Sequence, residues 1–287
     1  MTYHELTIAA RATLERAGIA SDVAQLDAEL LARHVLAWDR ATWLGHRGDT
    51  ATPSFPAAYE DLIARREARE PVAYIRGVQE FWGREFLVTP AVLIPRPETE
   101  LLVEAVASFL ARRPAARVVD VGTGSGCIAV TLALEHPLIT MHATDISPAA
   151  IAVARENAAR LGADARITFV RGAYLASTPA PIDLIVSNPP YVTARDLLAL
   201  PPEVVRYEPA EALFADADGL RDVRALIDAA QRALAPGGML AFEIGLGQAA
   251  DVTRAIADAP VLELIDILPD LQGIARTVVA HRVDRPR

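Results

Sequence analysis

The alternation of short apolar strands with amphipathic helices, in the C-terminal part of the chain, is the feature that most constrains its fold. Strands are expected at residues 117–122, 140–146, 167–171, 183–188, 239–245, 262–268 and 276–282. Helices fill the intervals, and the clearest span residues 148–161 and 220–234. Because helices of this length join neighbouring strands as βαβ crossovers, the pattern predicts an α/β domain. Its mostly parallel, seven-stranded, Rossmann-like sheet should be covered by helices on both faces.

The N-terminal part of the chain has a different character. Residues 6–70 have a helical pattern throughout, and Pro56 is suited to the first turn of a helix. Residues 77–97 combine aromatic and β-branched residues with Gly83 and Pro90, which is typical of a β-hairpin. We therefore predict a helical domain over 1–76, a hairpin linker over 77–97 and the α/β domain over 98–287.

Composition excludes several classes of function. A net charge of -9, from 37 acidic and 28 basic residues, argues against a protein that grips a long stretch of nucleic acid. The chain contains no lysine, which excludes Schiff-base chemistry and a P-loop lysine. One cysteine and scattered histidines predict no metal site. Without a signal pattern or a long apolar run, a cytoplasmic protein with no membrane contact is expected.

A glycine-rich turn follows the first predicted strand and opens a helix. Gly122, Gly124 and Gly126 alternate there with Thr123 and Ser125. Glycine permits positive φ angles and lets the backbone approach a ligand closely, and ligands of α/β sheets bind at this edge. The turn therefore predicts a binding site for a nucleotide-like molecule, and a simple tight turn is the structural alternative.

An acidic residue, Asp145, ends the second predicted strand about 20 residues after the turn, where a carboxylate can accept both hydroxyls of a ribose. That position fits NAD as well as S-adenosyl-L-methionine. The turn lacks the G-x-G-x-x-G spacing because position 127 is Cys, and Asp120 just before it suits a positively charged ligand. S-adenosyl-L-methionine is therefore the favoured cofactor.

The fourth predicted strand ends at Asn188 and is followed by Pro189, Pro190 and Tyr191. Because Pro190 has no N–H and biases Pro189 toward extended geometry, the Pro189 carbonyl can point into the same crevice as the Asn188 amide. Two acceptors could then hold the NH₂ group of a planar amide or aryl amine, with Tyr191 packed against the flat substrate. Proximity to a methyl donor would supply most of the rate without a strong general base. The structural alternative is a proline-rich loop.

Together the glycine turn, the Asp145 strand end and the Asn-Pro-Pro-Tyr segment resemble class I S-adenosylmethionine-dependent methyltransferases that act on planar nitrogen. Further segments narrow the resemblance to the PrmC/HemK family, over nearly the whole chain: PVAYIRGVQEFWG at 71–83, LIPRPETE at 93–100, YEPAEALFADADGL at 207–220 and EIGLGQ at 243–248. The resemblance implies N5-methylation of the glutamine in the Gly-Gly-Gln (GGQ) motif of class 1 peptide-chain release factors, which modulates translation termination. It also implies a helical N-terminal domain joined by a hairpin to the catalytic domain.

The resemblance also implies roles for particular residues. Cofactor contacts would come from Gly122 to Gly126, Asp145, Tyr174 and Asn188, and residues 188–191 would hold the glutamine. One departure concerns Gly172-Ala173-Tyr174, where the family commonly has Gly-Asp-Trp. Tyr174 can still stack on adenine, whereas the Ala173 side chain cannot accept a hydrogen bond.

Other functions share parts of this pattern. Nucleic-acid adenine-N6 methyltransferases carry the same tetrapeptide, but an acidic chain without a basic recognition domain fits them poorly. A sister family methylates a glutamine of a ribosomal protein, and the IPRPETE segment favours the release-factor branch. A third alternative is a non-enzymatic module that binds an adenosyl ligand. We expect the chain to be a monomer. We also expect its helical domain to dock the release factor, because a glutamine on a mobile loop offers little affinity by itself. The alternative is that the helical domain only stabilises the protein.

Overall fold

The computed structural model describes residues 1–176 and 178–283 of the chain. The chain forms two compact units, one of Met1–Val78 with Pro201–Tyr207, the other of Gln79–Leu200 with Glu208–Arg287. Residues 284–287, the end of the predicted catalytic domain, lie outside the described residues. The segment Pro201–Tyr207, which the sequence analysis assigned to the catalytic domain, packs with the helical unit.

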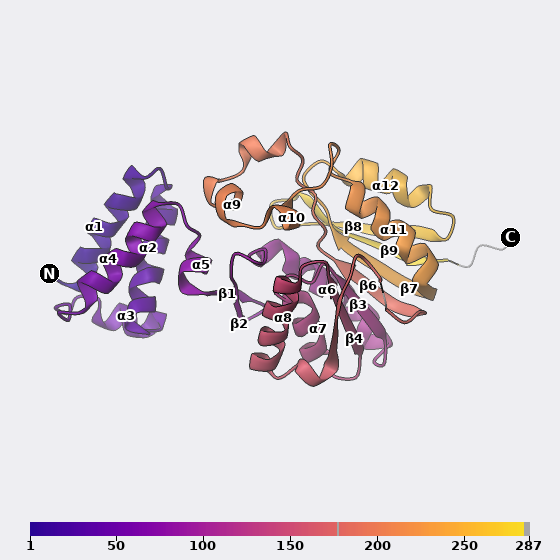
Figure 1. Ribbon diagram of the computed structural model, residues 1–287, viewed down its shortest axis with the longest axis horizontal. Coiled ribbons are helices and arrows are strands. Elements are labelled where there is room, and N and C mark those ends of the chain that lie inside the picture. Colours follow the sequence, from indigo (N-terminus) through magenta and orange to yellow (C-terminus); the bar gives the residue numbers. More distant parts are fainter. Residues whose placement is uncertain (177, 284–287) are drawn as a thin grey trace. The chain divides into compact units, whose positions relative to one another are not determined.

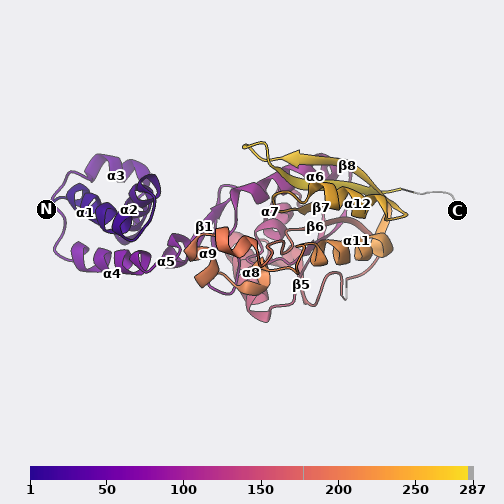
Figure 2. The same ribbon diagram turned by 90° about the horizontal axis from the view of Figure 1, so that it is seen from above.

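Helices build the first unit. They are α1 (Tyr3–Arg16), α2 (Ser21–Leu36), α3 (Arg40–His46), α4 (Phe55–Glu67) and α5 (Val72–Arg76), with α9 (Pro202–Tyr207) from the later segment. Thr2 and Glu5 form a capping box at the start of α1, and the Asp39 carboxylate caps α3 by accepting from the Thr42 N–H. Helices α1 and α2 pack on each other and on α4 (Figures 1 and 2). Their apolar faces enclose the Trp43 and Phe55 side chains.

A buried ion pair lies inside this unit. Arg66 donates to the Asp27 carboxylate at 2.7 Å, and both side chains are almost fully buried. Burial raises the pKa of Asp27, and the Arg66 guanidinium opposes that rise. Arg66 and Arg69 also donate to Glu203 at 3.2 and 2.5 Å, and Tyr207 donates its hydroxyl to the Ala68 carbonyl at 2.8 Å. Charge therefore ties α9 to the helical unit.

The second unit begins with a hairpin and continues as one sheet. Strands β1 (Val78–Phe81) and β2 (Arg84–Leu87) form a separate two-stranded sheet. The main sheet has the order β5-β4-β3-β6-β7-β9-β8, with the strands bounded as follows: β3 (Arg117–Val121), β4 (Thr140–Asp145), β5 (Ile167–Arg171), β6 (Ile182–Ser187), β7 (Leu234–Glu243), β8 (Leu262–Pro269) and β9 (Ala275–Arg282). Strands β3 to β7 are parallel, whereas β9 runs antiparallel to β7 and β8. The predicted seven-stranded, mostly parallel sheet is confirmed.

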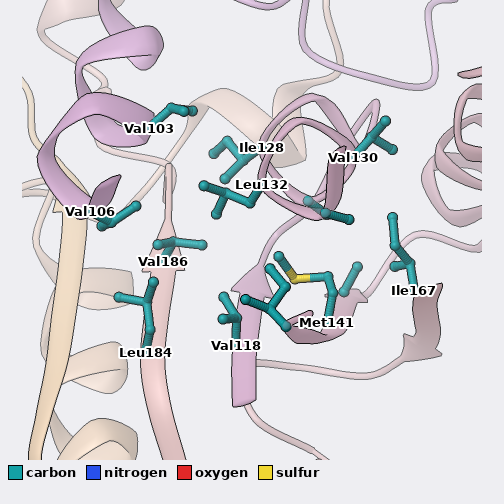
Figure 3. Close-up of a cluster of buried hydrophobic side chains, with 14 of the residues drawn as sticks. Val103, Val106, Val118, Ile128, Val130, Leu132, Met141, Ile167, Leu184 and Val186 are labelled. Carbon is teal, nitrogen blue, oxygen red and sulfur yellow. The ribbon is translucent and has the colours of Figure 1, made fainter. Parts of the chain in front are cut away.

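Helices cover both faces of this sheet. They are α6 (Glu100–Arg112), α7 (Cys127–Glu135), α8 (Pro148–Leu161), α11 (Arg221–Ala233) and α12 (Ala249–Ala257), with the short α10 (Ala210–Leu213) before α11. One apolar cluster joins α6, α7 and α8 to the sheet, and a second joins α11 and α12 to it. Figure 3 shows part of the first cluster, in which Val106 and Leu132 of the helices lie near Val186 of β6. Among the described residues, no helix combines the length and apolar character needed to cross a membrane.

The sheet order also fixes where a ligand can bind. From β3 the chain proceeds to β4 and β5 on one side and then returns to β6 on the other. Ligands of such sheets bind in the crevice beyond the carboxyl ends of the strands, at the point where the order reverses. The carboxyl ends of β3 and β6, which carry Gly122 and Asn188, meet at this point.

The ion pair inside the helical unit gives a stability prediction. Replacing Arg66 with Ala leaves the Asp27 carboxylate buried without its partner, which costs about 3–5 kcal/mol of unfolding free energy. The neighbouring Arg65 pairs with Glu70 at the surface, and Arg65→Ala should cost about 0–1 kcal/mol. Native-state hydrogen exchange of amides in α2 and α4 measures both values. Equal losses in the two variants would contradict the assignment of the buried pair.

Candidate active site

A cavity of about 410 Å³ opens at the carboxyl ends of β3, β4 and β6. It is large enough for a nucleoside-sized ligand. The residues that the sequence analysis proposed and that line it are Gly122, Thr123, Gly124, Ser125, Asp145, Tyr174, Asn188, Pro189 and Pro190. The remaining two, Gly126 and Tyr191, are not among the described residues of its wall. The crevice therefore gathers most of the proposed site from three separate strand ends.

Glycine is required at the three positions of the turn for different structural reasons. All have positive φ, at 72° for Gly122, 53° for Gly124 and 82° for Gly126. Among the described residues, and apart from the glycine's own chain neighbours, no heavy atom lies within 4 Å of a Cβ added at Gly122 or Gly124, whereas one at Gly126 would lie 3.1 Å from the Ala154 Cβ. Gly126 therefore permits the close approach of α7 to α8, while the other two present backbone to the cavity.

Asp145 is held by two backbone groups. Its Oδ2 accepts from the Gly124 N–H at 3.0 Å, and its Oδ1 accepts from the Ser147 N–H at 2.9 Å. Ser147 in turn caps α8 by accepting from the Ala150 N–H. Since each carboxylate oxygen has two lone-pair sites, Asp145 keeps acceptor capacity for a ligand at a fixed position in the wall.

Asp120 does not have the place that the sequence analysis gave it. The residue is fully buried and is not among the described residues of the cavity wall. Its Oδ2 accepts from the Thr123 hydroxyl at 2.6 Å. Burial raises the pKa of Asp120 to about 7, against the effect of that hydrogen bond. Asp120 thus supports the glycine turn through the Thr123 hydroxyl, away from the described wall of the cavity.

Tyr174 lies in the wall in a fixed orientation. It adopts a positive φ of 51°, which is uncommon for a residue with a side chain, and the Thr144 hydroxyl donates to its carbonyl at 2.7 Å. Its own hydroxyl donates to the Asp222 carboxylate at 2.9 Å. Burial and the Asp222 charge raise the pKa of Tyr174 to about 12. Its ring therefore stays neutral and is available for stacking.

Asn188 lies in the described wall of the cavity, whereas Tyr191 is directed at a buried carboxylate. Asn188 lines the cavity, and its Nδ2 donates to the Thr99 hydroxyl at 3.1 Å. Tyr191 instead donates its hydroxyl to the Glu243 carboxylate at 3.1 Å, and burial raises the pKa of Tyr191. Pro189, Pro190 and Thr99 line the same cavity as Asn188.

Several supporting residues were missed by sequence reasoning. Asn157 of α8 bonds the Leu87 backbone at 2.7 and 2.9 Å and the Ser125 carbonyl at 2.9 Å, and so joins the hairpin to the glycine turn. Thr99 and Asp222 line the cavity, and Glu243 lies behind it. Thr99 and Glu243 belong to the LIPRPETE and EIGLGQ segments, which were noted only for their resemblance. Asn157 is a single polar residue within an amphipathic helix, and no motif in the sequence marks it as part of the site.

The sheet order and the cavity at its reversal point define the class of protein: the second unit has the class I methyltransferase fold. A family model for the "Methyltransferase small domain" matches residues 97–206, and one for the "PrmC N-terminal domain" matches residues 5–77. A crystal structure of a methyltransferase from Pyrococcus furiosus is similar in fold, with a TM-score of 0.52 and 16% identity, covering 78% of this chain and 98% of the other. The hMettl16 catalytic domain has a TM-score of 0.56 at 16% identity, covering 78% and 82%.

Relatives of known name are similar over most of the chain. The release factor glutamine methyltransferase of Cereibacter sphaeroides is 46% identical over 268 residues, which are 93% of this chain and 94% of the relative. The protein of the same name from Bordetella pertussis is 45% identical over 254 residues, or 88% and 93%. The chain therefore belongs to the release factor glutamine methyltransferase family, and it is a methyltransferase. The resemblance to PrmC/HemK proteins is confirmed.

The Asp145 geometry gives a binding prediction. Asp145→Ala removes a carboxylate that orders the turn and can accept a ligand's hydroxyls, so the affinity for S-adenosyl-L-methionine should fall about tenfold or more. Glu156→Ala, at an exposed carboxylate on α8, is the control and should bind normally. Isothermal titration calorimetry measures both. Unchanged affinity in Asp145→Ala would remove Asp145 from the cofactor site.

Proposed function

We propose that the chain transfers the methyl group of S-adenosyl-L-methionine to N5 of the glutamine in the GGQ motif of class 1 peptide-chain release factors, which modulates translation termination. The observation that carries the proposal is the Asn188 amide in the cavity wall. Its Nδ2 is bonded to Thr99, so Oδ1 is left to accept from a substrate, beside Pro189 of the same wall.

The cavity fits the proposed cofactor in its donor and acceptor groups. The backbone of Gly122, Thr123 and Gly124 forms one part of the wall, and the Asp145 carboxylate offers acceptors for ribose hydroxyls. The Tyr174 ring offers a flat surface for adenine, with the Asp222 carboxylate beside it. Bound there, S-adenosyl-L-methionine supplies a methyl group attached to a positively charged sulfur.

The chemical difficulty lies in the glutamine, because the nitrogen lone pair of an amide is delocalised into its carbonyl. Asn188 Oδ1 and the Pro189 carbonyl are proposed to accept the two N–H groups, which fixes the nitrogen and raises its electron density. With S-adenosyl-L-methionine bound, the nitrogen lone pair would form the new N–C bond to the methyl group, and the sulfur would keep the electrons of the C–S bond that breaks. One proton then leaves the nitrogen to water. Fixed orientation supplies most of the rate, and a strong base is not required.

The release factor as substrate is supported by the relatives of this chain, which are named release factor glutamine methyltransferases. The acidic composition supports a protein substrate over nucleic acid. We further propose that the helical unit docks the body of the release factor. Ile8, Leu26 and Leu44 are each more than half exposed there, and they offer apolar contact. The proposal includes a monomer that acts in the cytoplasm.

A labelling experiment tests the substrate. The chain is mixed with methyl-labelled S-adenosyl-L-methionine and with a class 1 release factor, a large-subunit ribosomal protein, duplex DNA or tRNA. We expect label in the release factor, on the GGQ glutamine by mass spectrometry, and a much lower KM for the whole factor than for a GGQ peptide if the helical unit docks it. Label confined to nucleic acid or to the ribosomal protein would contradict the proposal. Label nowhere would favour a binding module.

The Asn188 amide gives a kinetic prediction. Asn188→Ala should lower kcat by about two or more orders of magnitude, the range typical of losing a key transition-state contact. Near-normal binding of S-adenosylhomocysteine and an unchanged circular dichroism spectrum would show that the variant is folded and holds the cofactor. A variant with near-normal kcat would remove Asn188 from the mechanism.

A further inference from the structure

The carboxylate of Glu243 lies behind the cavity wall and accepts hydrogen bonds from two residues of the site region, Thr99 and Tyr191. Glu243 ends β7 and is 1% exposed. Its Oε2 accepts from the Thr99 hydroxyl at 2.7 Å, and its Oε1 accepts from the Tyr191 hydroxyl at 3.1 Å. An ionised carboxylate can only accept hydrogen bonds. Both hydroxyl protons are therefore directed at Glu243.

The direction of the Thr99 hydroxyl decides the orientation of Asn188. Thr99 ends the short helix η1 (Pro97–Thr99) and is 2% exposed. A hydroxyl carries one hydrogen, and the Thr99 hydrogen is committed to Glu243, so toward Asn188 it can only accept. The NH₂ end of the Asn188 amide must then face Thr99, at 3.1 Å, and the Oδ1 end faces away.

We propose that Glu243 and Thr99 are positioning residues for methyl transfer, which fix the rotation of the Asn188 amide so that its oxygen, and not its nitrogen, is presented to the substrate NH₂ group. The inference rests on the proposed function, because it assigns Asn188 Oδ1 the task of accepting from the glutamine. Thr99 belongs to the LIPRPETE segment and Glu243 to the EIGLGQ segment. Neither residue reacts with the substrate in the proposed mechanism, and both act by positioning Asn188.

Tyr191 forms the second arm of the same network. A Cβ added at Gly245 would lie 2.9 Å from the Tyr191 Cδ2, and one added at Gly219 would lie 2.6 Å from the Tyr191 carbonyl oxygen. Gln248 accepts from the Gly245 N–H at 2.8 Å and donates to the Gly219 carbonyl at 3.1 Å. The two glycines thus allow close packing of the backbone around Tyr191. Tyr191 in turn holds the Glu243 carboxylate in place, so its role is to position Glu243 and not to contact the substrate.

The charge of Glu243 is necessary for this direction of hydrogen bonding. Thr99 of η1 and Tyr191 after β6 contact it directly, and the charged or titratable groups near enough to influence it are Glu98 of η1, Cys127 of α7 and Arg276 of β9, which pairs with Asp270. Burial raises the pKa of Glu243, and the hydrogen bonds from Thr99 and Tyr191 and the charge of Arg276 oppose the rise. A protonated Glu243 could donate to Thr99, whose hydrogen could then turn toward Asn188 and reverse the amide.

The test separates the hydroxyl from the shape of Thr99. Thr99→Val removes the hydroxyl and keeps the volume, and it should lower kcat about ten- to hundredfold, less than loss of a direct transition-state contact. S-adenosylhomocysteine affinity should be unchanged. Thr99→Ser keeps the hydroxyl and should restore kcat to within about threefold. Thr131→Val is the matched control, because the Thr131 hydroxyl is buried and has no hydrogen-bond partner among the described residues.

A pH profile tests the carboxylate. In the wild-type chain kcat should fall as the pH falls through the raised pKa of Glu243, because the deprotonated form is the active one. Glu243→Gln should have a low kcat that no longer shows this acid limb, with S-adenosylhomocysteine affinity retained as the sign of a folded site. An acid limb that persists unchanged in Glu243→Gln would assign the titration to another group and overturn the role of the Glu243 charge.

Two outcomes would overturn the role of Thr99, and a third concerns only the proposed substrate. Normal kcat in Thr99→Val would overturn the inference and leave the proposed function intact. Equal losses in Thr99→Val and Thr99→Ser would show a packing role and also overturn it. If the wild-type chain methylates a planar nitrogen other than the release-factor glutamine, the proposed substrate is wrong, and the same Thr99 comparison on that substrate still decides the inference.

Discussion

A buried carboxylate that can only accept hydrogen bonds sets the geometry on which the rest of the site depends. Strand pairing brings Glu243 to its place, because Ser187 of β6 is paired with Phe242 of β7 and the next residues of the two strands are Asn188 and Glu243. Thr99, just before α6, completes the chain of hydrogen bonds. The orientation of one amide in the cavity thus follows from the register of a parallel sheet and from one hydroxyl proton.

The same principle applies to the cofactor side of the cavity. Val121 of β3 is paired with Thr144 of β4, so the next residues along the chain, Gly122 and Asp145, lie side by side at the edge of the sheet. Gly122 begins the glycine turn there, and Asp145 places its carboxylate in the cavity wall. Backbone N–H groups then fix the Asp145 carboxylate without any long side chain. Both halves of the cavity are therefore built around residues at or directly after the carboxyl ends of parallel strands, which a rigid sheet positions with little loss of entropy on binding.

The parts that sequence analysis predicted are those with local signals. The sheet, the glycine turn, Asp145 and Asn188 follow from periodicity and from residues that end strands, and the structure brings these site residues together. The role of Glu243 could not be predicted, because it meets Thr99 across 144 residues of sequence and periodicity holds no such information. Tyr191 was expected to face the substrate, but its hydroxyl is directed at a buried carboxylate. The attachment of residues 201–207 to the helical unit likewise depends on distant arginines.

The orientation of the Asn188 amide depends on the positions of hydrogen atoms, which neutron diffraction from a deuterated crystal can locate. We predict that deuterium on the Thr99 hydroxyl points at Glu243, that Glu243 is deprotonated, and that one deuterium of the Asn188 amide points at Thr99. Deuterium on the Thr99 hydroxyl pointing at an Asn188 oxygen, with a protonated Glu243, would contradict it.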